Sequence, residues 1–280
     1  MQIGISLGIT GNRGGGAAAW SPNTLFAASE AGDWFDPSDL TKMWQDTAGT
    51  TAITADGQAV ARIDGQRGVV SLRQSNLANR PLYKTSAGLH WLQFDGTDDS
   101  LASAATLNLS GTDKLTICTG LRKISDASLG MVAENGGAVG TGDNRFYFAA
   151  SANATTQDYQ FCIGGVNSDV SNSDVLARSV SGFDAPITNL VTALLDKAGT
   201  STTAIDIRID AVAQTEATDT NIGTWTGNFS NETLFVGSRS GSSFRLNGNI
   251  YFLMVRGALT SGVNLSSLET FAGAKAGLTI

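Results

Sequence analysis

The chain has 280 residues, of which only 15% are charged while 33 are glycine, and its formal net charge is −7. Soluble domains average about 25% charged residues, so this composition argues against a helix-rich enzyme. The hydrophobic share of 41% is enough for a folded core and argues against wholesale disorder. Without a basic stripe or a long apolar run, we expect neither nucleic-acid binding nor membrane insertion.

The first 20 residues differ in character from the rest of the chain. Branched residues alternate there with glycine and serine, which predicts a strand with one small-residue face; they are Ile3, Ile5, Leu7 and Ile9. A glycine- and alanine-rich connector follows at 11–19. Two interpretations stay open: a first strand of the domain's own sheet, or a docking strand on a tether that adds to another subunit's sheet. The segment has no Lys or Arg before its apolar residues, so we do not predict a signal peptide.

Residues 21–280 are expected to form one domain. An irregular lead-in covers 21–80, with a short helix after Pro22, a short strand at 33–36 and a hairpin signalled by two Asp-Gly steps within 55–68. Clear strand patterns then occur at 89–94, 114–121, 145–150, 159–164, 187–196, 204–213, 232–237 and 248–257. Many short strands separated by turns indicate an all-β, antiparallel sandwich. Helical spacing returns only at 263–276.

Several single residues limit the chemistry. His90 is the sole histidine, so a two-histidine zinc site is excluded and a Ser-His-Asp triad would depend on that one side chain. Cys118 and Cys162 each lie in an apolar alternating run. We favour free core cysteines over a disulfide between them.

Two segments carry a resemblance to a known family. FDGTDDSL (94–101) and LFVGSRSGSSFRLNGNIYFLMVRGALTSG (234–262) resemble the turn signature and closing strands of laminin-G-like, concanavalin A-like jelly rolls. The stretch 21–60 and the end of the chain resemble segments that flank this sandwich in proteins of tailed bacteriophages. The resemblance covers about residues 20–278 and implies a jelly-roll sandwich in a virion structural protein. The chain departs from the family pattern after ADGQAV, where it continues as ARIDGQRGVVSLRQ (61–74).

The segment AIDIRID is similar to the strand that bears the paired carboxylates of laminarinase-type glycosidases. Alternation places Asp206, Arg208 and Asp210 on one face. The family's motif has two glutamates, whereas here an arginine stands between two aspartates and is expected to hold both ionised. We therefore expect no enzyme, and keep a polysaccharide-degrading glycoside hydrolase or lyase as the alternative.

Three acidic residues, Asp95, Asp98 and Asp99, share one turn. We favour an ordinary Asp-Gly turn in which Asp95 accepts backbone N–H groups. A calcium site is the alternative, since Ca²⁺ takes six to eight oxygen ligands, and no other cofactor is expected. A similar polar loop contains Asn167, Asp169, Asn172 and Asp174.

Trp225 lies between predicted strands and is expected to be the most exposed tryptophan, which makes it the candidate for contact with a glycan. The expected protein is a fibre, tail-tip or capsid-decorating subunit, assembled in the bacterial host cytoplasm and located in the virion. Residues 1–16 would bind other virion proteins, while the sandwich faces outward and binds host or environmental polysaccharide. The resemblance implies a homo-oligomer, with a trimer as the expected state.

Overall fold

The computed structural model describes residues 20–136, 144–151, 161–166, 176–221 and 225–280. The predicted docking strand with Ile3, Ile5, Leu7 and Ile9 lies outside these residues, as does the polar loop with Asn167, Asp169, Asn172 and Asp174. Both stay predictions, and so does the division of the chain at residue 20. Among the described residues, no helix has the length and apolar character needed to cross a membrane.

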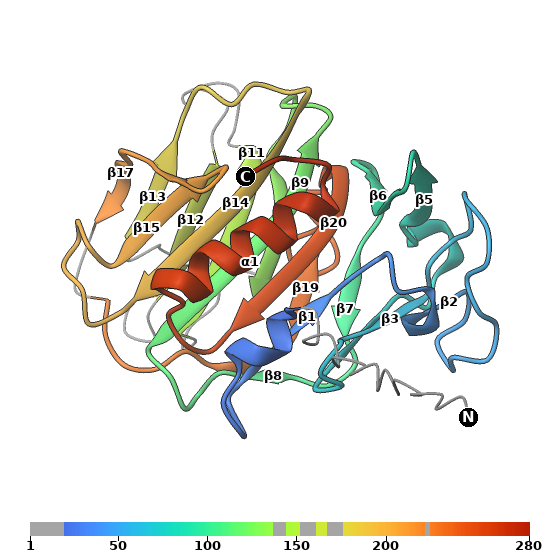
Figure 1. Cartoon of the computed structure of the whole chain (residues 1–280), viewed down its shortest axis with the longest axis horizontal. Coiled ribbons are helices and arrows are strands. Elements are labelled where there is room, and N and C mark those ends of the chain that lie inside the picture. The colour runs from blue at the N-terminus through green and yellow to red at the C-terminus, as the bar shows by residue number, and fades with distance from the viewer. Residues whose placement is uncertain (1–19, 137–143, 152–160, 167–175, 222–224) are drawn as a thin grey trace, which may run out of the picture.

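Two large antiparallel sheets face each other (Figure 1). Sheet A has the order β16 (Val212–Ala213), β15 (Ile205–Ile209), β14 (Ile187–Asp196), β9 (Lys114–Lys123), β20 (Asn247–Arg256), β6 (Leu89–Asp95) and β5 (Leu82–Ser86), with β1 (Gly32–Phe35) also paired to β20. Sheet B has the order β17 (Ala217–Asn221), β13 (Leu176–Val180), β12 (Phe161–Val166), β11 (Arg145–Ser151), β10 (Gly130–Asn135), β19 (Leu234–Val236), β7 (Leu101–Ser103), β4 (Ser71–Arg73), β3 (Arg62–Asp64) and β2 (Met43–Trp44). Strands β8 (Leu107–Asn108) and β18 (Asn231–Glu232) form a separate pair. The predicted all-β antiparallel sandwich is confirmed.

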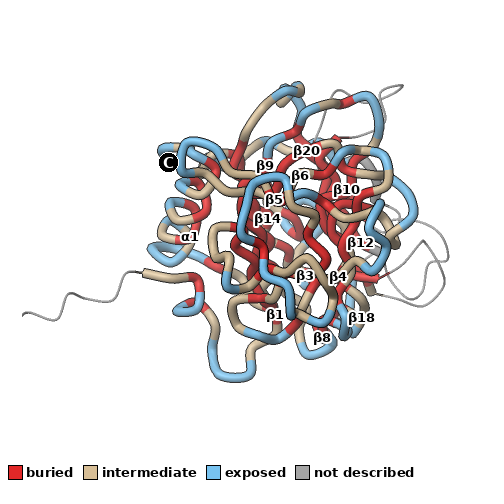
Figure 2. The backbone as a smooth tube through the Cα atoms, turned by 90° about the vertical axis from the view of Figure 1, so that its right-hand side faces the viewer, coloured by how far each residue is buried: buried red, intermediate tan, exposed pale blue. Residues whose placement is uncertain are grey.

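The core lies between the sheets because their strands alternate. In β15, Ile205, Ile207 and Ile209 are buried while the residues between them are partly exposed. Phe94 of sheet A and Phe148 of sheet B belong to the same continuous cluster of buried apolar side chains. Figure 2 shows the buried strands enclosed by exposed turns.

The helix α1 (Gly262–Lys275) covers the outer face of sheet A (Figure 1). Its Leu268 and Ala272 pack with Cys118 and Phe252 in a second apolar cluster. A side chain at Gly120 of β9 would stand 3.0 Å from the Cβ of Ala276, so the missing side chain lets the C-terminal segment approach the sheet. The predicted helix is confirmed, and Cys118 and Cys162 are both buried and free, as expected.

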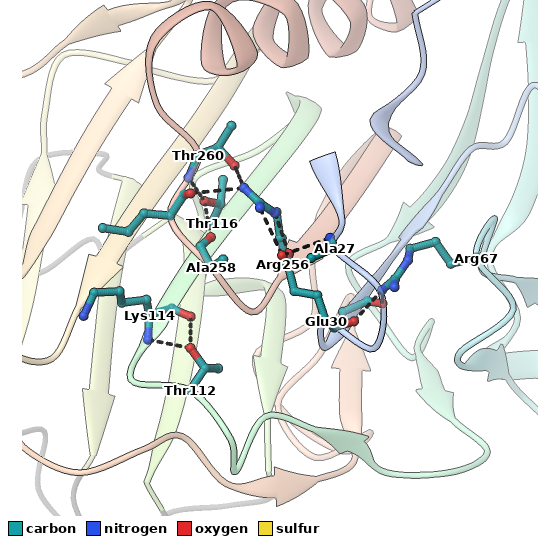
Figure 3. A network of polar contacts seen from close by, with 11 residues as sticks. Ala27, Glu30, Arg67, Thr112, Lys114, Thr116, Arg256, Ala258 and Thr260 are labelled. Atoms are coloured by element: carbon teal, nitrogen blue, oxygen red, sulfur yellow. Dashed lines mark hydrogen bonds and ion pairs between the residues drawn. The ribbon is translucent and has the colours of Figure 1, made fainter. Parts of the chain in front are cut away.

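Three 3₁₀ turns, η1 (Pro22–Leu25), η2 (Leu40–Lys42) and η3 (Leu77–Asn79), lie in the lead-in. A polar network joins the lead-in to the last strand (Figure 3). Arg256 of β20 donates to Glu30 at 2.6 and 3.1 Å, and also to the hydroxyl of Thr260 at 2.9 Å. The backbone N–H of Thr260 in turn donates to Thr116 Oγ1 of β9 at 2.8 Å. This network fixes the start of the described chain against sheet A and leads into α1.

Two strand predictions are corrected by the structure. The predicted strand 204–213 is a hairpin of β15 and β16, because Asp210 and Ala211 adopt positive φ angles of 50° and 64° and reverse the chain. The lead-in 21–80 is less irregular than expected, since its short strands β2, β3 and β4 extend sheet B. Strands of two or three residues carry too little alternation to be recognised from sequence.

Candidate functional site

One row of directly opposed residues crosses the whole of sheet B. Strand register aligns Trp44, Arg62, Arg73, Ala102, Phe235, Glu134, Tyr147, Gly164, Ala177 and Thr220, one residue from each of the ten strands. Adjacent strands lie about 4.8 Å apart, so the row is about 40 Å long. We call it the cross-strand row.

The cross-strand row lies on the outer face of sheet B, turned away from the core. Its members alternate along their strands with core residues such as Ile63, Leu72 and Phe148. The side chains of Trp44, Arg62, Arg73, Ala102, Phe235 and Tyr147 are partly exposed. Glu134 and Ala177 of the row are buried, so its accessible part consists of these partly exposed aromatic and cationic groups, which suit an elongated polar ligand.

Glu134 is the buried acid of the row. One of its carboxylate oxygens accepts from Arg239 Nε at 3.2 Å, and the other accepts from the backbone N–H of Ser240 at 2.7 Å. Burial outweighs these contacts and raises the pKa of Glu134 to about 7. The carboxyl group is therefore able to donate or to accept a proton near neutral pH.

Aromatic rings surround the Glu134–Arg239 pair. The Arg239 guanidinium carbon lies 5.5 Å from the ring centre of Tyr147 and 4.9 Å from that of Phe244. A side chain at Gly164 would stand 2.5 Å from the Tyr147 hydroxyl, so the tyrosine lies across β12 only because Gly164 has none. Phe244 is 40% exposed and forms the solvent side of the group.

The loop between β19 and β20 carries Arg239 and Phe244 and has an unusual backbone conformation. Ser240 and Phe244 have φ angles of 53° and 48°, in the left-handed region that disfavours side chains. Strained residues held by their surroundings cluster at functional sites. The same loop contacts the acidic turn, because Arg245 donates to the backbone carbonyl of Asp99 at 3.2 Å.

A second charged group lies at the other end of the row. Arg62 makes a two-point contact with Asp64, from Nε at 2.6 Å and from Nη2 at 2.8 Å. Its guanidinium carbon lies 4.8 Å from the ring centre of Trp44. Arg73 stands directly opposite Arg62 on the neighbouring strand. The row thus has one site with a buried acid and one with two cations.

The acidic turn forms around Asp95 as the simpler interpretation predicted, but Asp99 is buried, whereas that interpretation has it facing water. Asp95 accepts from the backbone N–H groups of Thr97 at 2.7 Å and Asp98 at 3.3 Å, and the Asp95 N–H donates to Asp99 at 3.0 Å. One oxygen from each of the three carboxylates lies within 4.8 Å of the others. Burial and the neighbouring Asp95 raise the pKa of Asp99 to about 6. Carboxylate oxygens grouped in this way are suitable ligands for a hard cation such as Ca²⁺. Calcium binding at this turn stays a prediction.

The expectation that Trp225 is exposed is wrong. Its side chain is 3% exposed and meets Phe229 edge-on, with ring centres 5.6 Å apart. The indole fits over β12 because Gly165 has no side chain, whose Cβ would stand 2.2 Å from the ring. Trp225 is therefore a core residue and no longer a candidate for glycan contact.

The charges around Asp206 also differ from expectation. Arg208 pairs with Glu269 of α1 at 2.7 Å, and Asp210 accepts from the backbone N–H of Leu190 at 2.8 Å. Burial, together with repulsion from Glu216, raises the pKa of Asp206. The arginine thus fixes the helix to sheet A, and its attraction lowers the pKa of Asp206 by less than burial raises it.

Sequence reasoning missed the cross-strand row, including Glu134 and Tyr147, and it also missed Arg239, which pairs with Glu134 from the loop between β19 and β20. The paired glycines of FCIGGV were a usable signal, because glycines inside a strand mark close approach of another group. Each of the two glycines makes room for an aromatic ring, Gly164 on the outer face and Gly165 on the inner face.

Comparison with known proteins supports the fold. No protein-family model matches the chain, and no curated protein does. A Trypanosoma rangeli sialidase in complex with 2,3-difluoro-KDN matches with a TM-score of 0.50 and 8% identity, over 91% of this chain and 34% of that chain. The botulinum neurotoxin type G receptor-binding domain matches with a TM-score of 0.44 and 8% identity, over 74% and 51% of the two chains. The Ruminococcus gnavus IT-sialidase CBM40 bound to α2,3-sialyllactose matches with a TM-score of 0.39 and 15% identity, over 58% of this chain and 84% of that chain.

The expectation that the chain is not an enzyme is corrected by the first of these matches. A sialidase, which is a glycoside hydrolase, contains a region with this fold, so the fold is no argument against catalysis. The chain spans about a third of that sialidase, as its 34% coverage shows, and at 8% identity the likeness shows the fold alone.

Proposed function

We propose that this chain is a structural protein of a tailed-bacteriophage particle whose sandwich binds a polysaccharide along the outer face of sheet B. The phage role is supported by the resemblance of residues 20–278 to such proteins. The cross-strand row is the observation that carries the polysaccharide part. Its aromatic rings at Trp44, Phe235 and Tyr147 provide flat surfaces for sugar rings, and its charged groups provide hydrogen bonds to hydroxyl groups.

The polysaccharide part is tested with the full chain on an array of bacterial glycans. Phe235→Ala removes a partly exposed ring from the middle of the row, and we expect it to abolish most of the binding. Leu82→Ala is the control, since it removes a 37% exposed apolar side chain from sheet A. Equal binding by wild type and Phe235→Ala would refute a polysaccharide site on this face.

The phage part is tested by assembly. We propose that residues 1–16 attach the subunit to the particle and that the subunit is a trimer, located in the virion. Deletion of these residues is expected to leave a folded sandwich that no longer joins purified particles. Particles that still contain the truncated protein would refute attachment through this segment. Light scattering of the full chain and the truncated protein tests the trimer.

Hydrolysis of the bound polysaccharide is a second candidate function, and Glu134 favours it. A carboxyl group with a pKa of about 7 meets the requirement for a general acid at neutral pH. Release of reducing ends by the wild type, lost in Glu134→Gln while binding persists, would establish it. Retained release in that variant would exclude Glu134 as the acid.

A further inference from the structure

A cavity of about 280 Å³ opens beside the cationic end of the cross-strand row. Its polar lining includes Arg62, Asp64, Ser71 and Arg73. Its apolar lining includes Val69, which is 48% exposed, and Ala104. The cavity is lined by β3, by β4, by the turn between them and by residues 104–105, which follow β7, and it lies next to the surface proposed for the polysaccharide.

The charge of this cavity is positive although the whole chain carries −7. Arg62 and Arg73 are directly opposed, and like charges in that position destabilise a sheet. Asp64 compensates Arg62, since both of its oxygens bind that guanidinium. Arg73 forms no ion pair with a described residue: within that part of the chain, its guanidinium makes one polar contact, from Nε to Ser71 Oγ at 3.1 Å.

We infer that Arg73 binds a carboxylate of an acidic saccharide, a sugar chain that contains uronic-acid residues. This inference rests on the proposed polysaccharide binding and names its ligand class. With Nε directed to Ser71, the two Nη groups present a pair of parallel donors, which matches the two oxygens of a planar carboxylate. The side chains of Val69 and Ala104 provide an apolar wall for the C–H face of the same sugar ring.

The experiment measures binding of the full chain to oligosaccharides by titration calorimetry. Acidic probes are fragments of oligogalacturonate, alginate and hyaluronan. Methyl-esterified oligogalacturonate and dextran are neutral comparators, and dextran sulfate tests a different anion. The variants are Arg73→Gln, which removes the charge, and Arg73→Lys, which keeps the charge but loses the paired donors. Arg122→Gln is the control, because Arg122 is an exposed arginine on β9 of sheet A.

At least one acidic probe is expected to bind, and esterification of its carboxylates is expected to weaken binding. Arg73→Gln should weaken binding about tenfold or more, and Arg73→Lys by a smaller factor. Arg122→Gln should have no effect. Because Arg73→Gln removes a like-charge pair, its unfolding midpoint should be no lower than that of the wild type. A purely structural arginine would show the reverse, with a lower midpoint and unchanged affinity.

Three results would overturn the inference. If neutral and acidic probes bind equally and Arg73→Gln has no effect, the proposed polysaccharide binding stands, and the inference that Arg73 binds an acidic saccharide is refuted. If no probe of either kind binds, both fail. If dextran sulfate is the only probe that binds in an Arg73-dependent manner, the group that Arg73 binds is not a carboxylate.

Discussion

Glu134 makes the stability of the sandwich depend on pH in a predictable direction. Its carboxyl group is 5% exposed, and its pKa is raised from 4.5 to about 7 when the chain folds. Between these values the folded protein binds more protons than the unfolded chain, so stability falls as pH rises. The contribution is fully present below pH 4.5 and is lost as pH rises through 7. At about 1.4 kcal/mol per pH unit, the loss amounts to about 3 kcal/mol.

Glu134→Gln tests this reasoning because glutamine keeps an oxygen acceptor for the Ser240 N–H but does not ionise. Urea denaturation of both proteins from pH 4 to 8 gives the difference in their free energies of unfolding. The difference is expected to move in favour of the variant by about 3 kcal/mol across that range. Asp99 and Lys197, whose pKa values are also shifted, are present in both proteins and cancel in the difference. A difference that is constant with pH would refute a raised pKa at Glu134.

Three further predictions concern single contacts. Gly165→Ala should destabilise the fold by about 1–3 kcal/mol, because the new Cβ would overlap the Trp225 ring, and an unchanged urea midpoint would contradict the packing described. Arg208→Ala should cost about 3–5 kcal/mol because it leaves Glu269, which is 1% exposed, as an unpaired buried charge; a double variant with Glu269→Gln should recover much of that loss. Calcium chloride and EDTA should leave the thermal midpoint unchanged if Asp95, Asp98 and Asp99 form only a turn, whereas a rise that Asp98→Asn abolishes would establish a calcium site.

The longer strands could be predicted from the sequence because their alternation is a local property. The segment 187–196 coincides with β14, in which Val191, Ala193 and Leu195 face the core at every second position. The hairpin 204–213 was missed because nothing in AIDIRIDAVA marks Asp210 and Ala211 as a turn. Aspartate tolerates the left-handed region better than most residues, but it does so in few of its occurrences.

The cross-strand row could not be predicted, because it depends on the order of strands and on their register. Arg73 and Ala102 are 29 positions apart in the sequence, and Phe235, the next member of the row, is a further 133 positions away. Alternation shows which residues share a face of one strand, but not which strands are neighbours. The prediction that Trp225 is exposed was wrong for a related reason, since the burial of this side chain depends on Gly165, which lies in a strand far away in the sequence.

The few charges of this chain make the position of Arg73 informative. On sheet B and in the loops beside it, Arg62 pairs with Asp64, Arg178 with Glu216 and Arg239 with Glu134, each within ion-pair distance. Arg73 has no such partner among the described residues, and it stands directly opposite another arginine. It also belongs to the segment 61–74, where the sequence departs from the phage family that it resembles. Among the described residues, the one hydrogen bond of the Arg73 guanidinium, to Ser71, does not compensate its charge, and local arrangements that do not favour stability are common at functional sites. A ligand carboxylate at Arg73 would supply the pairing that Asp64 already supplies at Arg62.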